Sequence, residues 1–487
     1  MSGLLRLVPD EPEPTHDLAT ATAAGTARSR TRPSWATDPI DELAQELAEV
    51  CAVAVHPDEI AAVLEADGLT GEQITERYGR ADAFELAAEL YARVPRSHPE
   101  PGPRPDPWKA HPARFALRAL VFTLPGFGYA LAAPLMTGTR DGYGLPLGTT
   151  GLVASALVAW AWNQGFAHRA YLRLATGRAA AGRCLQWGAP LGALLATAAT
   201  LAAPRTTGVT SFAAGQALYL AAATVLLVLG REKLLLLTLL PTAAGGTALL
   251  AVPLPAAARI GLLLATLAAV TGTAVHEIVR ARRTGSADAP LPRLSPLASL
   301  PYGLFGLGCG VLTTLAALGD VLRHSPGART AGAAVIALTL SMGAAEWLLY
   351  RCRSLALAAL TRATTTRGLL LGGVRVLAFC ALVYLASLAA LALATGALWH
   401  NGPPLTAVRL TGLLALGTVL WAGLLLQAFG VAWLPAALCL AAAGGETTAG
   451  ALRVSAPATV QLVVCTGAAA ALLAVAAHRL GRITTHR

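Results

Sequence analysis

One acidic side chain stands out because it lies inside a stretch that otherwise suits a lipid environment. The segment "SMGAAEWLLYRCR" (341–353) ends an apolar run, and its Glu346 is the only carboxylate that we expect within any long hydrophobic segment. A charge inside a bilayer is costly and usually has a partner. We therefore expect Glu346 to pair with Arg375 or Arg169 as a gate on the inner side. The alternative is an interfacial glutamate that fixes the end of its helix.

A few other polar side chains in or beside apolar segments are candidates for contact with a substrate or for a gate. They are Asn163, Gln164, Arg169, Arg351 and Arg375. Arg375 is expected about one turn inside its segment, deeper than topology requires. The arginines at the inner ends of segments could bind the phosphates of anionic lipids. Topology alone also predicts arginines at these places.

The sequence predicts neither an enzyme nor a metal protein. It contains no HExxH, GxSxG, phosphate-loop or DxD pattern, and the predicted outer loops are too short to build an active site. The seven cysteines form no CxxC pair, and most lie in apolar segments, where cysteine behaves as a small hydrophobe. We therefore expect no catalytic residues, no metal and no cofactor.

The composition is that of a membrane protein. The hydrophobic fraction is 55%, the charged fraction is 13% and the mean hydropathy is +0.57. Residues 1–110 carry 20 acidic and 10 basic residues, whereas the rest of the chain carries 7 and 27. The net charge of +10 thus sums an acidic head and a basic membrane body, so it does not indicate nucleic-acid binding. The bias to Ala, Leu, Gly and Arg favours a bacterial cytoplasmic (inner) membrane.

Twelve hydrophobic segments are long enough to cross a bilayer, which takes roughly 20 residues each. We place them at 115–136, 149–168, 185–203, 210–230, 234–252, 259–279, 298–319, 331–350, 372–396, 407–426, 429–444 and 456–478. With both termini in the cytoplasm, 17 basic residues fall in inner segments and 7 in outer loops. This asymmetry follows the positive-inside rule. The predicted fold class is therefore an all-α polytopic membrane bundle with both termini inside.

The chain outside the hydrophobic segments divides into smaller parts. Residues 1–37 are predicted to be a disordered tail, and 38–94 an acidic cytoplasmic domain of four short helices. No signal peptide is visible, so this domain is expected to stay inside. Residues 95–114 form a Pro-rich linker, and 284–297 a cytoplasmic linker between membrane segments 115–283 and 298–487. The partners expected are the bilayer, its anionic lipids and a protein that binds residues 38–94.

The two membrane parts repeat one plan. The first segment of each carries glycine and proline, "TLPGFGYALAAP" (123–134) and "SLPYGLFGLGCG" (299–310), and the second leads into an arginine-rich inner segment. Corresponding segments lie about 182–198 residues apart, which aligns Gln164 with Glu346 and Arg169 with Arg351. Six plus six segments of equal orientation imply two halves related by an axis along the membrane normal.

Two transporter classes share this architecture. In the major facilitator class, the inner loop after the second segment carries Gly–x–x–x–Asp–Arg–x–Gly. Here "GFAHRAYLRLATGR" has His168 at the acidic position, a departure from that class. In its six-plus-six plan over residues 115–478, the chain resembles the multidrug/oligosaccharidyl-lipid/polysaccharide flippase class. That resemblance implies bent first and seventh helices around a central cavity, with bends at Pro125, Gly126, Gly128, Pro301, Gly303 and Gly306.

These observations predict a transporter or flippase that moves lipid-linked or amphipathic cell-envelope precursors by alternating access between two six-helix halves. The alternative is a non-transporting scaffold whose acidic domain recruits a partner. A carrier should contain a polar cleft lined by the first, second, seventh and eighth segments, with Asn163, Gln164 and Glu346 in it. A scaffold should have a dry bundle, with its function in residues 38–94.

Overall fold

The computed structural model describes residues 38–97, 112–284, 295–324, 328–399 and 402–482. The chain forms two compact units, residues 10–106 and the remainder, which are described separately. Within the described residues both units are helical, and the only β pairing is an isolated bridge between Arg140 and Pro146. The predicted tail 1–37 and most of the two predicted linkers lie outside the described residues.

The smaller unit contains five short helices: α1 (Pro39–Glu46), α2 (Ala48–Val53), α3 (Pro57–Ala66), α4 (Gly71–Tyr78) and α5 (Ala83–Arg93). The prediction of four helices was wrong because the backbone leaves helical geometry at Leu47, which separates α1 from α2. Asp38 caps α1 by accepting a hydrogen bond from the backbone N–H of Ile40. It also pairs with Arg93 at the end of α5, and this guanidinium holds the pKa of Asp38 below its usual value.

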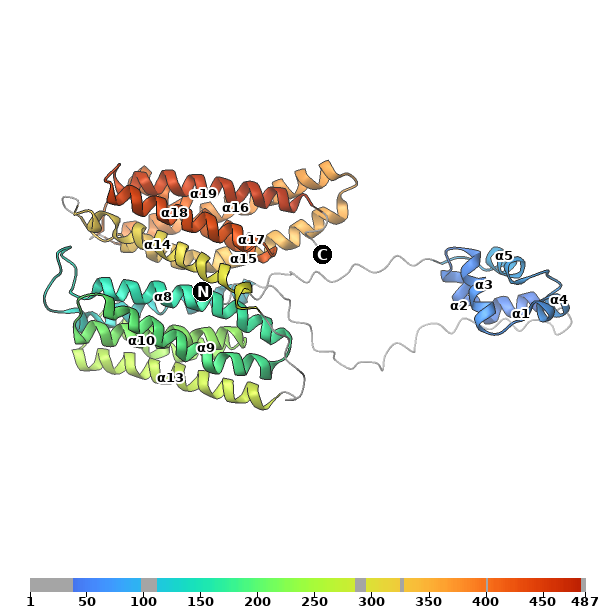
Figure 1. Ribbon diagram of the computed structural model, residues 1–487, viewed down its shortest axis with the longest axis horizontal. Coiled ribbons are helices and arrows are strands. Elements are labelled where there is room, and N and C mark those ends of the chain that lie inside the picture. Colours follow the sequence, from blue (N-terminus) through green and yellow to red (C-terminus); the bar gives the residue numbers. More distant parts are fainter. Residues whose placement is uncertain (1–37, 98–111, 285–294, 325–327, 400–401, 483–487) are drawn as a thin grey trace. The chain divides into compact units, whose positions relative to one another are not determined.

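The larger unit places a helix, or a broken pair of helices, on each of the twelve predicted segments (Figure 1). In chain order these are α6 (Pro112–Thr123) with α7 (Gly126–Leu131) and η2 (Ala133–Met136), α8 (Thr149–Ala175), α9 (Arg178–Ala199) with η3 (Thr200–Ala202), α10 (Thr207–Val228), α11 (Glu232–Thr238) with α12 (Leu240–Ala248), α13 (Ala256–Arg283), α14 (Leu300–Leu322, after η4, Pro296–Ala298), α15 (Gly332–Arg362), α16 (Thr366–Leu398), α17 (Ala407–Ala428), α18 (Trp433–Ala451) and α19 (Pro457–Leu480).

Eight of the described helices are, by length and composition, each able to cross a membrane. They are α9 with η3, α10, α13, α14, α15, α16, α17 and α19. Of the other predicted segments, two are broken into shorter helices, and α8 and α18 are unbroken. The protein is thus a polytopic helical membrane protein, as the sequence predicted.

The first and fifth segments are interrupted, and a proline stands at each interruption. The first helix ends at Thr123 and resumes at Gly126, after Pro125. The fifth breaks between Thr238 and Leu240, ahead of Pro241. Proline lacks an N–H and clashes with the preceding turn, so it ends a helix or starts a new one.

The seventh segment is not interrupted at Pro301, Gly303 or Gly306, where the sequence predicted bends. Helix α14 runs unbroken from Leu300 to Leu322. Pro301 lies in its first turn, where a proline costs no helical hydrogen bond. The two glycines instead allow close contact with α8, because a Cβ at Gly303 would lie 3.1 Å from the Ala161 carbonyl oxygen.

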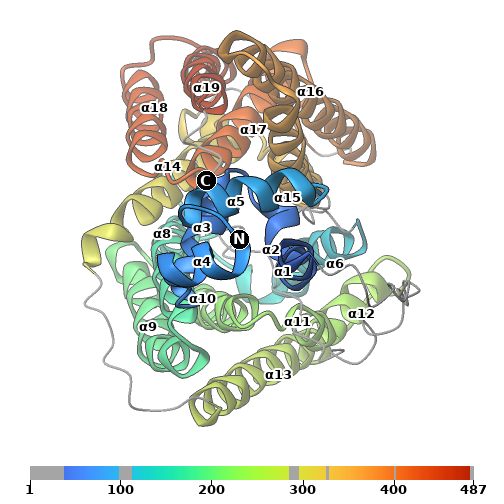
Figure 2. The same cartoon turned by 90° about the vertical axis from the view of Figure 1, so that its right-hand side faces the viewer.

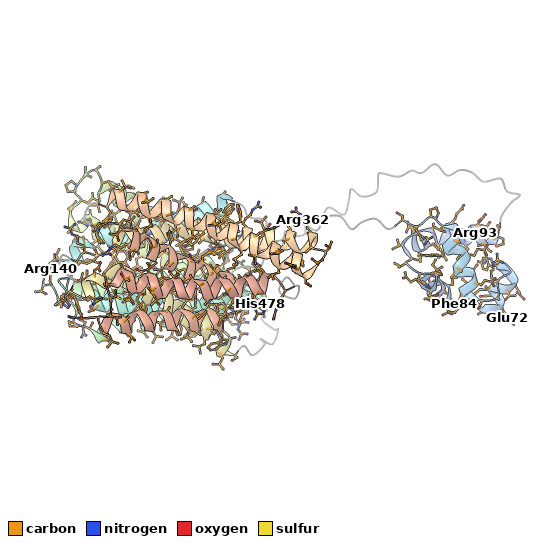
Figure 3. All side chains as sticks on the ribbon, turned by 90° about the horizontal axis from the view of Figure 1, so that it is seen from above. Glu72, Phe84, Arg93, Arg140, Arg362 and His478 are labelled. Atoms are coloured by element: carbon orange, nitrogen blue, oxygen red, sulfur yellow. The ribbon has the colours of Figure 1, made fainter. Side chains whose placement is uncertain are left out.

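The six-helix halves lie side by side. Viewed along the bundle in Figure 2, α8–α13 lie on one side and α14–α19 on the other. Two helix pairs join the halves, α8 with α14 and α6 with α15. Figure 3 shows Arg140 at one end of the bundle and Arg362 and His478 toward the other. We refer to these as the Arg140 end and the Arg362 end.

Candidate functional site

The contact between α8 and α14 closes the Arg362 end on one side. Helix α8 starts after the Arg140 loop, so Gly165 lies about 24 Å along it, at 1.5 Å per residue. A Cβ at Gly165 would lie 3.1 Å from the carbonyl oxygen of Ser299. One turn on, the His168 ring stacks on Tyr302 with centroids 3.7 Å apart, and its Nδ1 lies 3.1 Å from Ser299 Oγ. These side chains bring the two halves into contact at this depth.

The contact between α6 and α15 closes the other side. A Cβ at Gly343 would lie 2.5 Å from the Cβ of Ala119 and 3.1 Å from the carbonyl oxygen of Phe115. The rings of Phe115 and Tyr350 have centroids 5.2 Å apart. The glycine therefore lets the two backbones approach, and an aromatic pair fills the space beside them.

A buried ionic cluster lies within the α6–α15 contact. The Arg118 guanidinium on α6 forms ion pairs with Glu346 on α15 and with Glu232 on α11. Its Nε lies 2.7 Å from Glu232 Oε1, and the Nε of Arg114 lies 3.6 Å from Glu232 Oε2. Arg118 is fully buried and Glu346 is 1% exposed. Two guanidinium groups and two carboxylates balance in charge, which offsets part of the cost of removing them from water.

The two contacts are equivalent under the internal repeat. An offset of 182 residues places His168 on Tyr350, and each packs an aromatic ring from the opposite half. The same offset places Ala161 on Gly343, and at both positions the backbone of the paired helix lies close by. Gln164 likewise corresponds to Glu346, and it packs on Gly306 of α14. The two halves thus meet through the same positions of the repeat.

A cavity of about 420 Å³ lies between the halves, from mid-depth toward the Arg140 end. Residues of α7, α8, α10, α14 and α15 line it, and its polar members include Asn163, Gln164, Gln216 and Thr313. Among the described residues, the Oδ1 atom of Asn163 and the Nε1 atom of Trp160 are buried without a hydrogen-bond partner. Buried polar atoms nearly always have a partner, so these two leave the cavity wall with capacity for hydrogen bonds to water or a polar ligand.

The structure places several residues of the predicted gate elsewhere than the sequence predicted. Glu346 lies in the ionic cluster and does not line the cavity. Its partner is Arg118, not Arg375 or Arg169. Arg375 is exposed on α16, and within the described residues its side chain makes no hydrogen bond or ion pair. Arg169 is half-buried near the end of α8, and Arg351 is exposed on α15.

Sequence reasoning missed Arg118, Glu232 and other acidic residues within helices. Glu277 of α13 lies within the predicted segment 259–279, and Asp320 of α14 and Glu446 of α18 lie in helices just beyond the predicted ends, so the prediction that Glu346 is the only such carboxylate was wrong. Helices α14 and α18 extend past the predicted hydrophobic segments 298–319 and 429–444. A usable signal existed, because Arg118 and Glu346 are single opposite charges in apolar segments and such charges tend to pair.

Among the described residues, no group of three His, Cys, Asp or Glu side chains is placed to hold a metal ion. The three buried cysteines Cys309, Cys439 and Cys465 lie near one another within the second half. The polar groups at the interface of the halves can bind by hydrogen bonds and ion pairs.

Comparisons with known proteins give a similarity of architecture. No family model matches the chain, and no curated protein matches it. Among solved structures, the chain is similar to an inward-facing multidrug resistance MATE family transporter of the MOP superfamily. The match covers 76% of this chain and 95% of that chain, with 12% identity and a TM-score of 0.41.

Proposed function

We propose that the protein is a carrier that moves lipid-linked or amphipathic cell-envelope precursors across the bacterial inner membrane. The observation that carries this proposal is the cavity between the halves, with the unpartnered polar atoms of Asn163 and Trp160 in its wall. A membrane protein with only a structural role gains nothing from buried polar atoms without partners, since each one costs free energy. A passing polar group would supply the missing hydrogen bonds.

The contacts between the halves support alternating access as the mechanism. Both α8–α14 and α6–α15 close the bundle below the cavity, toward the Arg362 end. Separation of these pairs would open the cavity to that end, while the bundle would close nearer Arg140. A buried cluster of paired charges suits such a gate. A buried charge without its partner is unstable, so a partly separated contact is disfavoured and the closed state is well defined.

In this proposal, the distribution of basic residues decides which end of the bundle faces the cytoplasm. The Arg362 end bears the arginine-rich segments, so it would face the cytoplasm. The described state is then closed to the cytoplasm, and Arg118, Glu232 and Glu346 form the inner gate. Arginines near that end, including Arg169 and Arg351, could attract lipid phosphates toward the gate.

The scaffold alternative predicted a dry bundle, and the cavity between the halves favours the carrier over it. One observation still supports a partner for residues 38–94. Val53, Val55 and Phe84 are more than half exposed on a strongly acidic unit. A contiguous patch of exposed apolar side chains would mark a surface that binds another protein.

The experiment is a measurement of lipid-linked glycan intermediates in a deletion strain. The strain is complemented with wild type, with Glu346→Gln, with Asn163→Leu, or with a version lacking residues 1–94. The carrier proposal expects an intermediate to accumulate on the cytoplasmic side, relieved by wild type and not by Asn163→Leu at equal abundance. Normal glycans in the deletion strain contradict an envelope cargo. Rescue by every version except the one lacking residues 1–94 favours the scaffold.

A further inference from the structure

A second cavity of about 280 Å³ lies inside the first half, between α7, α10, α12 and α13. Its wall is largely apolar, with Phe212, Leu263 and Leu267 among its residues. The hydroxyl groups of Thr242 and Thr266 in this wall bond to each other at 2.7 Å, so they need no ligand. None of the residues that line this chamber has a buried polar atom without a partner among the described residues. The chamber therefore suits a hydrocarbon group.

The chamber and the central cavity share part of their walls. Tyr129, Gln216 and Leu220 line both spaces, and the Tyr129 hydroxyl donates to Gln216 Oε1 at 2.9 Å. This hydrogen bond lies between a cavity with unpartnered polar atoms and a chamber without them.

The interrupted helices of the first half both reach this chamber. Pro125, at the break of the first segment, and Leu239, at the break of the fifth, belong to its wall. Non-helical backbone at membrane depth is tolerated only where it is buried or lines a cavity. Transporters commonly place binding sites at such discontinuous helices.

The second half lacks these breaks. Its helices α14 and α18 correspond to the first and fifth segments, and both are continuous. The core of the second half is filled by Trp421, which is fully buried and stacks on Tyr384 with centroids 6.0 Å apart. Within the described residues, the two helix breaks that line this chamber are therefore particular to the first half.

We infer that the first half binds the hydrocarbon chain of an amphipathic molecule whose polar part occupies the central cavity, with the molecule lying across Tyr129–Gln216. This inference rests on the proposed carrier function for the identity of that molecule as cargo. It specifies the substrate class as one polar head joined to a flexible apolar chain. The two spaces bind the two parts of one molecule, and the hydrogen bond between Tyr129 and Gln216 must yield when the chain enters.

The test uses two lysophosphatidylglycerol probes, one with a diazirine in the acyl chain and one with a diazirine on the head group. The purified full-length protein is placed in nanodiscs of phosphatidylethanolamine and phosphatidylglycerol and irradiated. Labelled peptides are identified by mass spectrometry. We expect the chain probe on α10 and α13 around Phe212 and Leu263, and the head probe on α8 and α14 around Asn163 and Thr313.

Gly215→Phe fills the chamber, because Gly215 lines it and a Cβ there meets only Leu267 Cδ2 at 3.6 Å. We expect this variant to reduce labelling by both probes about tenfold, as filling a binding pocket does. Leu218 lies on the same helix and lines neither cavity, so Leu218→Phe should leave labelling unchanged. Ser211→Phe, in the same wall, repeats the test if Gly215→Phe does not yield monodisperse protein.

Two results overturn the inference. One is equal labelling of wild type and Gly215→Phe by the chain probe. The other is a chain probe in the chamber with the head probe only outside the central cavity, which identifies a structural lipid. The measurement needs no transport, so the two proposals fail separately. A protein that binds the probes as expected but moves no precursor contradicts the carrier function. One that moves precursor with an unlabelled chamber contradicts this inference.

Discussion

At the scale of single residues, Arg118 joins the two halves of the protein. It lies on α6 and contacts a carboxylate of its own half, Glu232, and one of the opposite half, Glu346. Breaking a buried ion pair by removing one partner typically costs about 3–5 kcal/mol, since a charge is left uncompensated. Removal of the two carboxylates should therefore have different effects on the contact between the halves, because of the two only Glu346 lies in the opposite half from Arg118.

This difference gives the first prediction. Glu346→Gln should weaken the α6–α15 contact, while Arg118 keeps its pairing with Glu232. We expect hydrogen–deuterium exchange in the helix segment 340–350 to become about tenfold faster, as opening becomes easier by about 1–2 kcal/mol. Glu232→Gln is the matched control, because it removes a pairing within one half. It should lower the melting temperature without accelerating exchange in that segment. Equal exchange in both variants would show that the cluster stabilises the fold without acting as a gate.

The residue scale also shows what sequence could not supply. Glu346 was identified from its type and position, but its partner depends on which helices touch, and hydropathy does not determine that. Arg118 was hidden because it lies three residues into the first predicted segment, close to the end of a charged linker. Arg375 was expected inside the bilayer from its depth along α16, yet its direction around the helix leaves it exposed. Depth along a helix can be read from a sequence more safely than the face on which a residue lies.

At the scale of helices, the Gly/Pro motif of the first and seventh segments accompanies a break in one helix and none in the other. Pro125 interrupts its segment, whereas Pro301 begins an unbroken helix. The difference is one of position, since a proline in the first turn costs no hydrogen bond and one in the interior does. Gly303 and Gly306 are explained by the nearness of α8, which composition alone does not predict. Segment number and order were predictable from hydropathy because about 20 apolar residues are needed to cross a bilayer.

The second prediction concerns the α8–α14 contact. His168→Cys with Ser299→Cys, in a Cys184→Ser background, places two thiols where Nδ1 and Oγ now lie 3.1 Å apart. We expect a short bis-methanethiosulfonate reagent to link the two thiols and to block transport, so that the precursor accumulates again. Reduction of the link should restore transport. Linked peptides are measured by mass spectrometry. Arg169→Cys with Ser299→Cys is the control, because successive helical residues are turned by about 100° and these thiols should not link. Linkage of the first pair with undiminished transport would exclude opening of this contact from the cycle.

At the scale of the whole membrane unit, the repeat explains both where the halves meet and where they differ. Equivalent positions, His168 with Tyr350 and Ala161 with Gly343, form the two contacts. A structure with this symmetry can exchange one closed end for the other by rocking its halves around a fixed site. The loop pattern predicted the repeat, but the chamber in the first half was not predictable, because it depends on how two broken helices pack.

The third prediction tests which side of the membrane the cavity faces. With the Arg362 end in the cytoplasm, a membrane-impermeant maleimide added to intact cells should label Thr313→Cys, which lines the cavity. The same reagent added to inverted vesicles should label it at least tenfold more slowly, because the α8–α14 and α6–α15 contacts exclude water from that end. Arg140→Cys and Arg362→Cys, both exposed, are the topology controls, expected to react only in cells and only in inverted vesicles, respectively.

If these two exchange sides, the charge-based orientation is wrong. If they behave as expected while Thr313→Cys reacts faster in inverted vesicles, the orientation stands and the cavity opens to the cytoplasm. Glu346→Gln should shift Thr313→Cys toward that second pattern, since it weakens the contact that closes the cytoplasmic end.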